Sequence, residues 1–173
     1  FMVPADKIDR LTDCYTFVPG KGRVMYDKGG ESAWSRMPRQ LSGGGGLVST
    51  ALDYHRFCQM LLNGGELEGE RVIGRKTLEL MTMNHLNGDM ADMGSPRFSE
   101  STYTGIGFGL GFSVTIDPAK AHIVGTPGEY AWGGAASTAF WCDPQEDMAV
   151  VLLTQLMPSS TYPIRRELRV LTY

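Results

Sequence analysis

The stretch from Gly128 to Leu156 constrains the fold most, because it reads as successive antiparallel strands. Residues 129–132 form a short aromatic segment, and residues 137–142 are rich in side chains that favour strands. Residues 143–146, Asp-Pro-Gln-Glu, have the composition of a tight turn. Residues 148–153 are an unbroken apolar run, which predicts a strand buried on both faces. The stretch therefore predicts an antiparallel sheet at the centre of the fold.

Small residues interrupt this stretch directly after Trp132. Gly133, Gly134, Ala135 and Ala136 stand where a strand usually carries larger side chains. Glycine within a strand often marks a close approach by a ligand or by another backbone segment. A bulge or a tight corner would require the same residues. The spacing alone leaves both interpretations open.

Composition places the chain among globular proteins and excludes several partners. Its 173 residues are enough for one domain with a sizeable core. The formal net charge of −3 argues against nucleic acid, and no basic run suggests binding to an anionic membrane surface. No stretch approaches the roughly 20 apolar residues of a membrane-spanning helix. We therefore expect neither a nucleic-acid partner nor a membrane span.

The cysteines indicate a reducing environment. Cys14, Cys58 and Cys142 are an odd number at unrelated spacings, which favours free thiols and a cytoplasmic location. Cys58 is predicted to lie on the buried face of a helix. The chain begins at Phe1 without a signal-peptide pattern, so we expect that residues of the protein precede it.

Helix and loop signals divide the first half of the chain. Residues 1–46 are repeatedly interrupted by glycine and proline and predict mostly loop. Residues 50–62 predict a helix that begins with a capping pair and stops at Asn-Gly-Gly. Residues 75–85 predict a second helix, and residues 87–104 predict a polar, mobile surface loop.

The second half reads as a glycine-rich strand, the central stretch and a final helix. Residues 105–116 alternate glycine with apolar residues, which predicts a strand whose glycine face lets another segment pack very close. A helix is predicted from Pro163 onward. Its predicted apolar face is Ile164, Leu168 and Leu171, and its predicted water-facing residues are Arg165, Arg166 and Arg169.

The chain lacks the common motifs of nucleophilic and metal-dependent catalysis. It contains no Gly-x-Ser-x-Gly and no Ser-x-x-Lys. Its three histidines have no metal-ligand spacing, so neither a metal nor another cofactor is predicted. Ser137, beside the glycine pair, has no base near it in the sequence and reads as a strand residue. We therefore expect this chain alone to be inactive as a hydrolase.

Several motifs together resemble the later part of the serine β-lactamase-like hydrolases. That family includes class C β-lactamases, penicillin-binding-protein-related enzymes and carboxylesterases. The motifs are residues 42–54 (SGGGGLVSTALDY), 63–65 (NGG), 105–112 (GIGFGLGF) and 132–138 (WGGAAST), followed by Asp143-Pro144. Each motif alone is unspecific, whereas their order and spacing together are specific. The resemblance covers residues 41–173 well and residues 1–40 loosely.

The resemblance implies where this chain contributes to an active site. The family combines a Ser-x-x-Lys motif, a Tyr-x-Asn-type motif and a Lys-Thr-Gly-type triplet on a strand. Trp132-Gly133-Gly134 matches the triplet in the form of the esterase branch and is the implied substrate-binding wall. The N–H of Ala135 is then the implied oxyanion donor. The serine, lysine and tyrosine of the family are absent from this chain, and the uncharged Trp132 favours neutral esters.

The sequence thus predicts an incomplete α/β (α+β) sandwich of the serine β-lactamase/penicillin-binding-protein-like type, an antiparallel sheet with flanking helices. Residues 1–173 are expected to be the C-terminal portion of one serine hydrolase domain. Residues 47–86 form its helical region, and residues 105–173 its strands and last helix. The expected substrate is a small ester or β-lactam-like amide, cleaved through an acyl-enzyme with the missing N-terminal half or another chain. The alternative is a non-catalytic degenerate homologue or a binding module.

Overall fold

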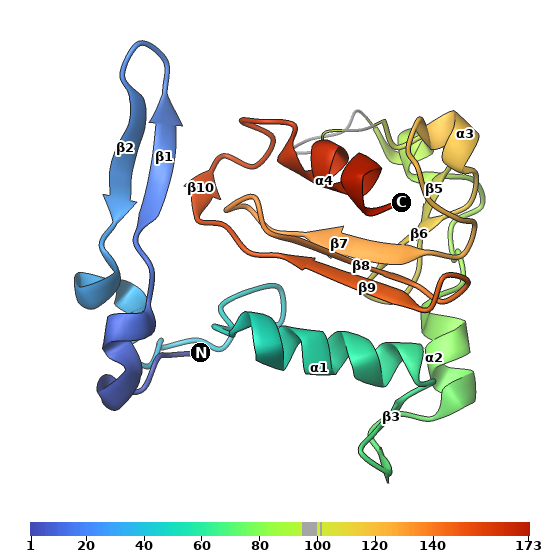
Figure 1. Cartoon of the computed structure of the whole chain (residues 1–173), viewed down its shortest axis with the longest axis horizontal. Coiled ribbons are helices and arrows are strands. Elements are labelled where there is room, and N and C mark those ends of the chain that lie inside the picture. The colour runs from blue at the N-terminus through green and yellow to red at the C-terminus, as the bar shows by residue number, and fades with distance from the viewer. Residues whose placement is uncertain (95–99, 101) are drawn as a thin grey trace.

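Five strands form an antiparallel sheet with helices on both faces, so the structure is an α/β sandwich (Figure 1). The computed structural model describes residues 1–94, 100 and 102–173. The helix α1 (Ala51–Leu62) lies on one face of the sheet and α4 (Ile164–Thr172) on the other. The predicted fold class is confirmed. The strands follow chain order across the sheet and are β5 (Ile106–Phe108), β6 (Ser113–Thr115), β7 (Tyr130–Gly133), β8 (Ala139–Asp143) and β9 (Met148–Leu152).

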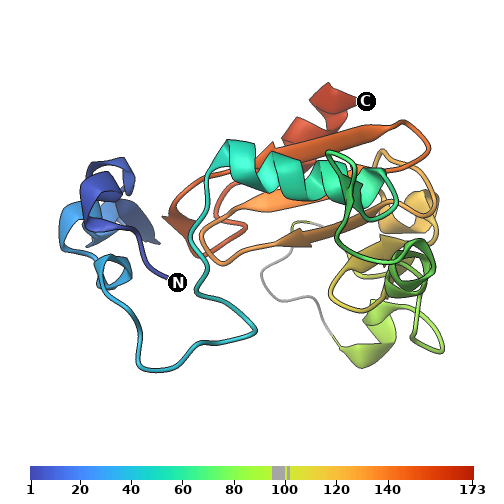
Figure 2. The ribbon, with the colours of Figure 1, turned by 90° about the horizontal axis from the view of Figure 1, so that it is seen from below.

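The helix α1 forms as the sequence predicts. The Thr50 hydroxyl accepts a hydrogen bond from the Asp53 N–H at 3.2 Å and so caps the first turn. Cys58 and Leu61 are buried with Phe140 of β8 in the apolar core. The predicted burial of Cys58 is therefore confirmed. Figure 2 shows α1 running along this face of the sheet.

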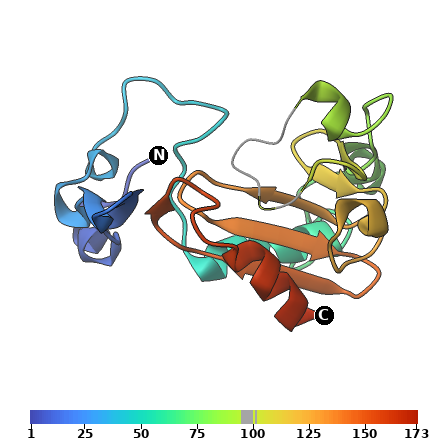
Figure 3. The same cartoon turned by 90° about the horizontal axis from the view of Figure 1, so that it is seen from above.

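The helix α4 lies against the sheet (Figure 3), and polar side chains contribute to that contact, which corrects part of the prediction for this helix. Ile164 and Leu168 are half-buried, in line with the predicted apolar face. Arg165 and Arg169 are predicted to face water, but Arg165 is half-buried and the Arg169 side chain is only 12% exposed. Leu171, predicted to pack, is 84% exposed. The reason is that the sheet presents the carboxylate of Glu129, with which Arg169 forms an ion pair. Arg166 is exposed, as predicted.

Residues 105–116 form a hairpin of β5 and β6, not the single predicted strand. Gly111, with φ +100°, lies in the turn, which the Gly109 N–H closes by donating to the Phe112 carbonyl at 2.8 Å. The apolar strand β9 is also less buried than predicted. It is the last strand of the sheet, so one of its edges has no neighbouring strand among the described residues.

The second helix, α2 (Arg75–Met81), ends before the predicted His85 because the β5–β6 hairpin packs against its last turn. The Leu110 N–H donates to the Met81 carbonyl at 2.8 Å and satisfies one of the free carbonyls at the helix end. A side chain at Gly109 would overlap the same carbonyl. The predicted close approach at the glycine face is therefore confirmed.

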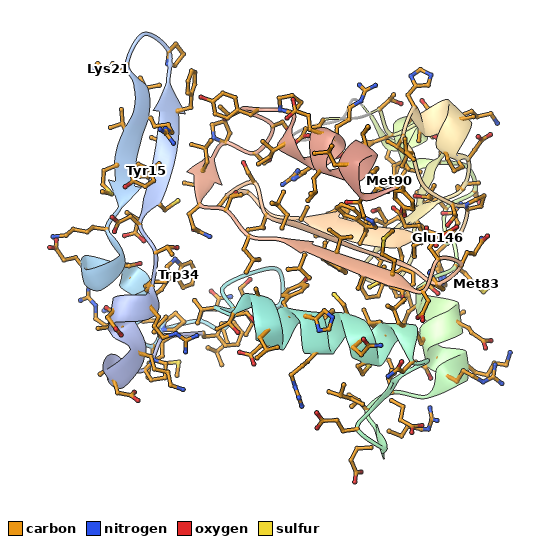
Figure 4. The ribbon with its side chains drawn as sticks, in the orientation of Figure 1. Tyr15, Lys21, Trp34, Met83, Met90 and Glu146 are labelled. Atoms are coloured by element: carbon orange, nitrogen blue, oxygen red, sulfur yellow. The ribbon has the colours of Figure 1, made fainter. Side chains whose placement is uncertain are left out.

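The N-terminal residues form a hairpin beside the sandwich (Figure 1). β1 (Cys14–Val18) pairs antiparallel with β2 (Gly22–Asp27) and parallel with β10 (Leu156–Met157). The prediction of mostly loop for residues 1–46 is therefore wrong over these two strands. The Pro19-Gly20 pair that suggested a loop lies in the hairpin turn, residues 19–21, between two runs of strand-forming residues. Figure 4 shows Lys21 at the tip of this hairpin.

The remaining elements are short. One of them, η4 (Met90–Met93), lies within the predicted polar loop of residues 87–104, and residues 95–99 and 101 of that loop are outside the described part of the chain. None of the helices described is long and apolar enough to cross a membrane. The short elements are η1 (Ala5–Arg10), η2 (Gly29–Glu31), η3 (Ala33–Ser35), β3 (Glu66–Leu67), β4 (Glu70–Arg71), η4 (Met90–Met93) and α3 (Pro118–Ala121).

Candidate active site

The last residues of β7 have a neighbouring strand on one side only. β7 pairs with β8 as far as Gly133, which lies opposite Ala139. It pairs with β6 only as far as Ala131, which lies opposite Ser113. Beyond Ala131, no strand in the described part of the chain pairs with that edge of β7.

The backbone groups of Gly133 point to this open edge. In an antiparallel sheet, the N–H and C=O groups of successive residues point alternately to the two sides of a strand. The Gly134 N–H donates to the Thr138 carbonyl at 2.9 Å, on the β8 side. The N–H and C=O of Gly133 therefore point to the other side, past the end of β6. An extended ligand can bind such an edge as an added strand would.

The chain turns sharply after β7, over residues 134–137. The Ser137 N–H donates to the Gly134 carbonyl at 3.1 Å, and the Ser137 hydroxyl donates to the Leu156 carbonyl at 2.7 Å. Of the two interpretations left open by the sequence, a tight corner is thus present. Ser137 belongs to this corner, with φ +67°, and not to the strand predicted for it. Ala135 is exposed in the corner, and among the described residues its N–H has no hydrogen-bond partner.

The absence of side chains at Gly133 and Gly134 has a cause within the chain. A Cβ at Gly133 would lie 3.0 Å from Cζ of Arg165, and a Cβ at Gly134 would overlap the hydroxyl of Thr138. Neighbouring side chains therefore fill the space that the glycines leave. The strand edge at Gly133 and the exposed Ala135 remain as surfaces that a ligand can reach.

The four residues predicted for the site lie together. The ring of Trp132 is 46% exposed and packs edge-on against Phe108, with 5.1 Å between ring centroids. A cavity of about 620 Å³ adjoins this region. Its lining includes Trp132, Gly133, Gly134 and Ala135, together with Arg165 of α4.

Arg165 was predicted from the sequence to face water and not to be part of the site. Its Nη2 donates to the carbonyl oxygens of Gly134 and Thr138, each at 2.8 Å. Burial lowers the pKa of the Arg165 guanidinium from its ordinary value, and the carboxylate of Glu100 opposes that shift. The available signal is the i, i+4 spacing of Arg165 and Arg169, which puts both cations on one side of the helix.

A second polar group joins α4 to the sheet. Glu129, at 1% exposure, forms an ion pair with Arg169, whose Cζ lies 4.6 Å from the centroid of the Trp141 ring. The phenol oxygen of Tyr173 lies 2.8 Å from Oε2 of Glu129 and 2.7 Å from Oδ2 of Asp143. Burial and these two hydrogen bonds raise the pKa of Tyr173. The group holds α4, and with it Arg165, against the sheet.

This arrangement can orient a reacting carbonyl but is not a complete catalytic centre. Ala135 offers one hydrogen-bond donor, whereas the oxyanion of acyl transfer is usually stabilised by two. Ser137 is 2% exposed and its hydroxyl is bonded to a backbone carbonyl, so it is not available as a nucleophile. Among the described residues, no group of His, Cys, Asp and Glu side chains could hold a metal ion.

The chain matches the beta-lactamase family over residues 1–173 and belongs to this family. Protein Rv1367c of Mycobacterium tuberculosis (strain ATCC 25618 / H37Rv) is 37% identical to it over 164 residues. The uncharacterized protein MT1414 of Mycobacterium tuberculosis (strain CDC 1551 / Oshkosh) has the same identity over the same length. The family resemblance read from the sequence is confirmed.

Two solved structures share the fold at low sequence identity. EstCE1, described as a hydrolase with promiscuous acyltransferase activity, is 22% identical with a TM-score of 0.76. Simvastatin synthase (LovD) from Aspergillus terreus is 22% identical with a TM-score of 0.71. The match to Rv1367c covers 91% of this chain and 39% of Rv1367c. The match to EstCE1 covers 100% of this chain and 45% of EstCE1, and the match to LovD covers 95% of this chain and 40% of LovD. The chain therefore spans less than half the length of these relatives.

Proposed function

We propose that residues 1–173 are the C-terminal portion of one serine hydrolase domain that cleaves esters or β-lactam-like amides through an acyl-enzyme. The nucleophilic serine, its lysine and the tyrosine belong to a preceding part of the same protein or to another chain. This chain contributes the strand Trp132–Gly134 as one wall of the substrate site. It also contributes the N–H of Ala135 as one of the two oxyanion donors.

The observation that carries the proposal is the N–H of the exposed residue Ala135, which follows an open strand edge and has no partner among the described residues. A free backbone donor at a cavity can bind the oxygen of a reacting carbonyl at no cost of breaking an existing hydrogen bond. The edge at Gly133 can bind the polar groups of an extended acyl chain. Membership of the beta-lactamase family adds support for acyl transfer.

The substrate is expected to be uncharged near the acyl group. By the family resemblance, Trp132 stands where related enzymes have a cation, and its half-exposed ring offers apolar contact instead. Esters therefore fit better than penicillins, which carry a carboxylate. Transfer of the acyl group to an alcohol in place of water is a further expectation, because EstCE1 is described as having promiscuous acyltransferase activity.

The proposal gives the protein a small-molecule substrate, no cofactor and no nucleic-acid partner, in a reducing compartment such as the cytoplasm. The three free thiols, Cys14, Cys58 and Cys142, are consistent with that compartment. Fractionation of cells that express the full-length protein would test the location directly.

Gly134→Ala in the full-length protein tests the oxyanion assignment. The added methyl group overlaps the Thr138 hydroxyl, so the peptide between Gly134 and Ala135 must shift. We expect kcat for p-nitrophenyl esters to fall, by on the order of 10²–10³ if the donor is lost. Combining it with Thr138→Ala removes the overlap and should restore most of kcat. Trp132→Ala should instead reorder the preference among short and long acyl chains.

The outcomes separate the proposal from its alternative. A Gly134→Ala variant with the kcat of the parent would show that the Ala135 assignment is wrong. A full-length protein that turns over neither esters nor β-lactams would favour a non-catalytic homologue or a binding module. This chain expressed alone should show no turnover above background, because it supplies one donor and its sequence contains no Ser-x-x-Lys motif.

A further inference from the structure

Arg165 binds both ends of the corner that carries Ala135. Its Nη2 donates to the carbonyl of Gly134 and to the carbonyl of Thr138, each at 2.8 Å. The Gly134 carbonyl and the Ala135 N–H belong to the same peptide unit. We infer that Arg165 is a positioning residue, which orients and polarises the Ala135 N–H for the reaction. This inference rests on the proposed function.

The geometry of the peptide unit explains the orientation. In a trans peptide the C=O and N–H bonds point in opposite directions within one plane. The Gly134 carbonyl receives two donors, Nη2 of Arg165 at 2.8 Å and the Ser137 N–H at 3.1 Å. Fixing the carbonyl therefore fixes the N–H of Ala135 on the opposite side, away from α4.

The charge of the guanidinium explains the polarisation. A hydrogen bond from a charged donor is stronger than one between neutral groups. Hydrogen bonds in a chain polarise one another, so a strong donor at a carbonyl makes the N–H of the same amide a better donor. Arg165 therefore strengthens the Ala135 N–H without touching the substrate.

The fold holds Arg165 at this place. One helical turn further on, Arg169 forms an ion pair with the buried Glu129 and anchors α4 on the sheet. On the strand, Gly133 has no Cβ, and one built there would lie 3.0 Å from Cζ of Arg165. The glycine thus leaves the room that the guanidinium occupies. A helix outside the strand edge thereby controls the peptide that faces the substrate.

The test compares Arg165→Met and Arg165→Lys in the full-length protein, with p-nitrophenyl esters and phenylboronic acid. A boronic acid forms a tetrahedral adduct with a catalytic serine, and one of its oxygens takes the position of the oxyanion. For Arg165→Met we expect kcat to fall about tenfold to hundredfold, with little change in KM. The dissociation constant of the boronic acid should rise by a similar factor. Arg165→Lys keeps a cationic donor and should give intermediate values of both.

The matched control is Arg23→Met, the same substitution at an exposed arginine of β2 that does not line the cavity, which should keep the kcat and the boronic acid affinity of the parent. A loss of kcat at Arg165 with unchanged boronic acid affinity would overturn the inference, because a general structural defect would behave in that way. Should Arg165→Met not fold by circular dichroism, Arg165→Lys has to meet the same criterion. If the parent is active and the Arg165 variants keep its kcat, the inference is wrong and the proposed function stands. If the parent has neither esterase nor lactamase activity, both the proposed function and the inference are wrong.

Discussion

The two faces of the central sheet are held by different interactions. On the α1 face, apolar side chains such as Cys58 and Phe140 are buried against one another. On the α4 face, the ion pair of Glu129 and Arg169 lies over the ring of Trp141. Phe140 and Trp141 are successive residues of β8 and therefore point to opposite faces. The same strands thus build an apolar contact on one side and, on the other, a contact that includes a buried ion pair.

This difference separates stability from geometry. Burial of apolar area is non-directional, so the α1 face stabilises the fold without fixing the orientation of any one peptide. Hydrogen bonds weaken when their angles change, so they hold their partners in a defined orientation. A charged donor makes such a bond stronger. The α4 face therefore fixes the corner after β7 through Arg165. Substitutions on the α1 face should change stability, whereas those on the α4 face should also change the candidate site.

The largest effect on stability is expected from Phe140→Ala on the α1 face. The Phe140 ring is buried and packs against the rings of Tyr54 and Phe112, with centroid distances of 5.2 Å and 6.1 Å. The cavity should lower the free energy of unfolding by about 3–5 kcal/mol, measured by urea denaturation of the purified protein. Leu171→Ala is the control, because that side chain is 84% exposed. Equal losses for both variants would mean that the α1 face is not the core.

Glu129→Gln should be nearly as costly and tests the α4 face. The substitution leaves the cation of Arg169, only 12% exposed, without its charged partner. We expect a loss of about 3 kcal/mol, and partial recovery in Glu129→Gln/Arg169→Met, which removes the unpaired charge. The control is Glu68→Gln in the exposed ion pair with Arg56, which should leave the free energy of unfolding close to that of the parent because solvent screens the pair. Equal losses at Glu129 and Glu68 would show that packing alone holds this face.

The sequence predicted the α1 face better than the α4 face, and the reason is physical. The helix after Thr50, the burial of Cys58 and the strand at residues 148–152 follow from local signals, namely a cap and apolar runs. An ion pair is a tertiary contact, and Arg169 and Glu129 are 40 positions apart in the chain. Without a visible partner, an arginine in a helix reads as solvated.

The residues of the candidate site were predicted from the family resemblance. The open strand edge beside them could not be predicted from the sequence. The motif from Trp132 to Ala135 selected the residues that line the cavity. Whether β6 continues beside Gly133 depends on the hairpin turn at Gly111, which a period-two pattern of glycine and apolar residues does not reveal. The hairpin of β1 and β2 was missed for a similar reason, since its turn residues also occur in loops.

Tyr173→Phe should have a smaller effect and measures how much the phenol adds to the α4 face. The hydroxyl lies between the carboxylates of Glu129 and Asp143, but both keep other partners, Arg169 for the first and the Thr126 hydroxyl for the second. Removing it should lower the free energy of unfolding by about 1 kcal/mol. Tyr26→Phe is the matched control, because Tyr26 is 63% exposed. A loss of stability in Tyr173→Phe no larger than in Tyr26→Phe would show that the phenol does not stabilise the α4 face.

The smallest effect is a pH dependence of the α1 face, carried by Tyr54. Burial raises the pKa of Tyr54 from its ordinary value to about 12. Between pH 10 and pH 12, roughly, the unfolded chain releases this proton while the folded chain keeps it, so stability falls as the pH rises. Because the ring is only partly buried, we expect its share at about pH 11 to be below roughly 1 kcal/mol, less than the full 1.36 kcal/mol of one pKa unit. Urea denaturation at about pH 9 and pH 11 should show a shallower fall for Tyr54→Phe than for the parent. The parent and the variant falling equally would mean that this face, like a purely apolar contact, does not respond to pH through Tyr54.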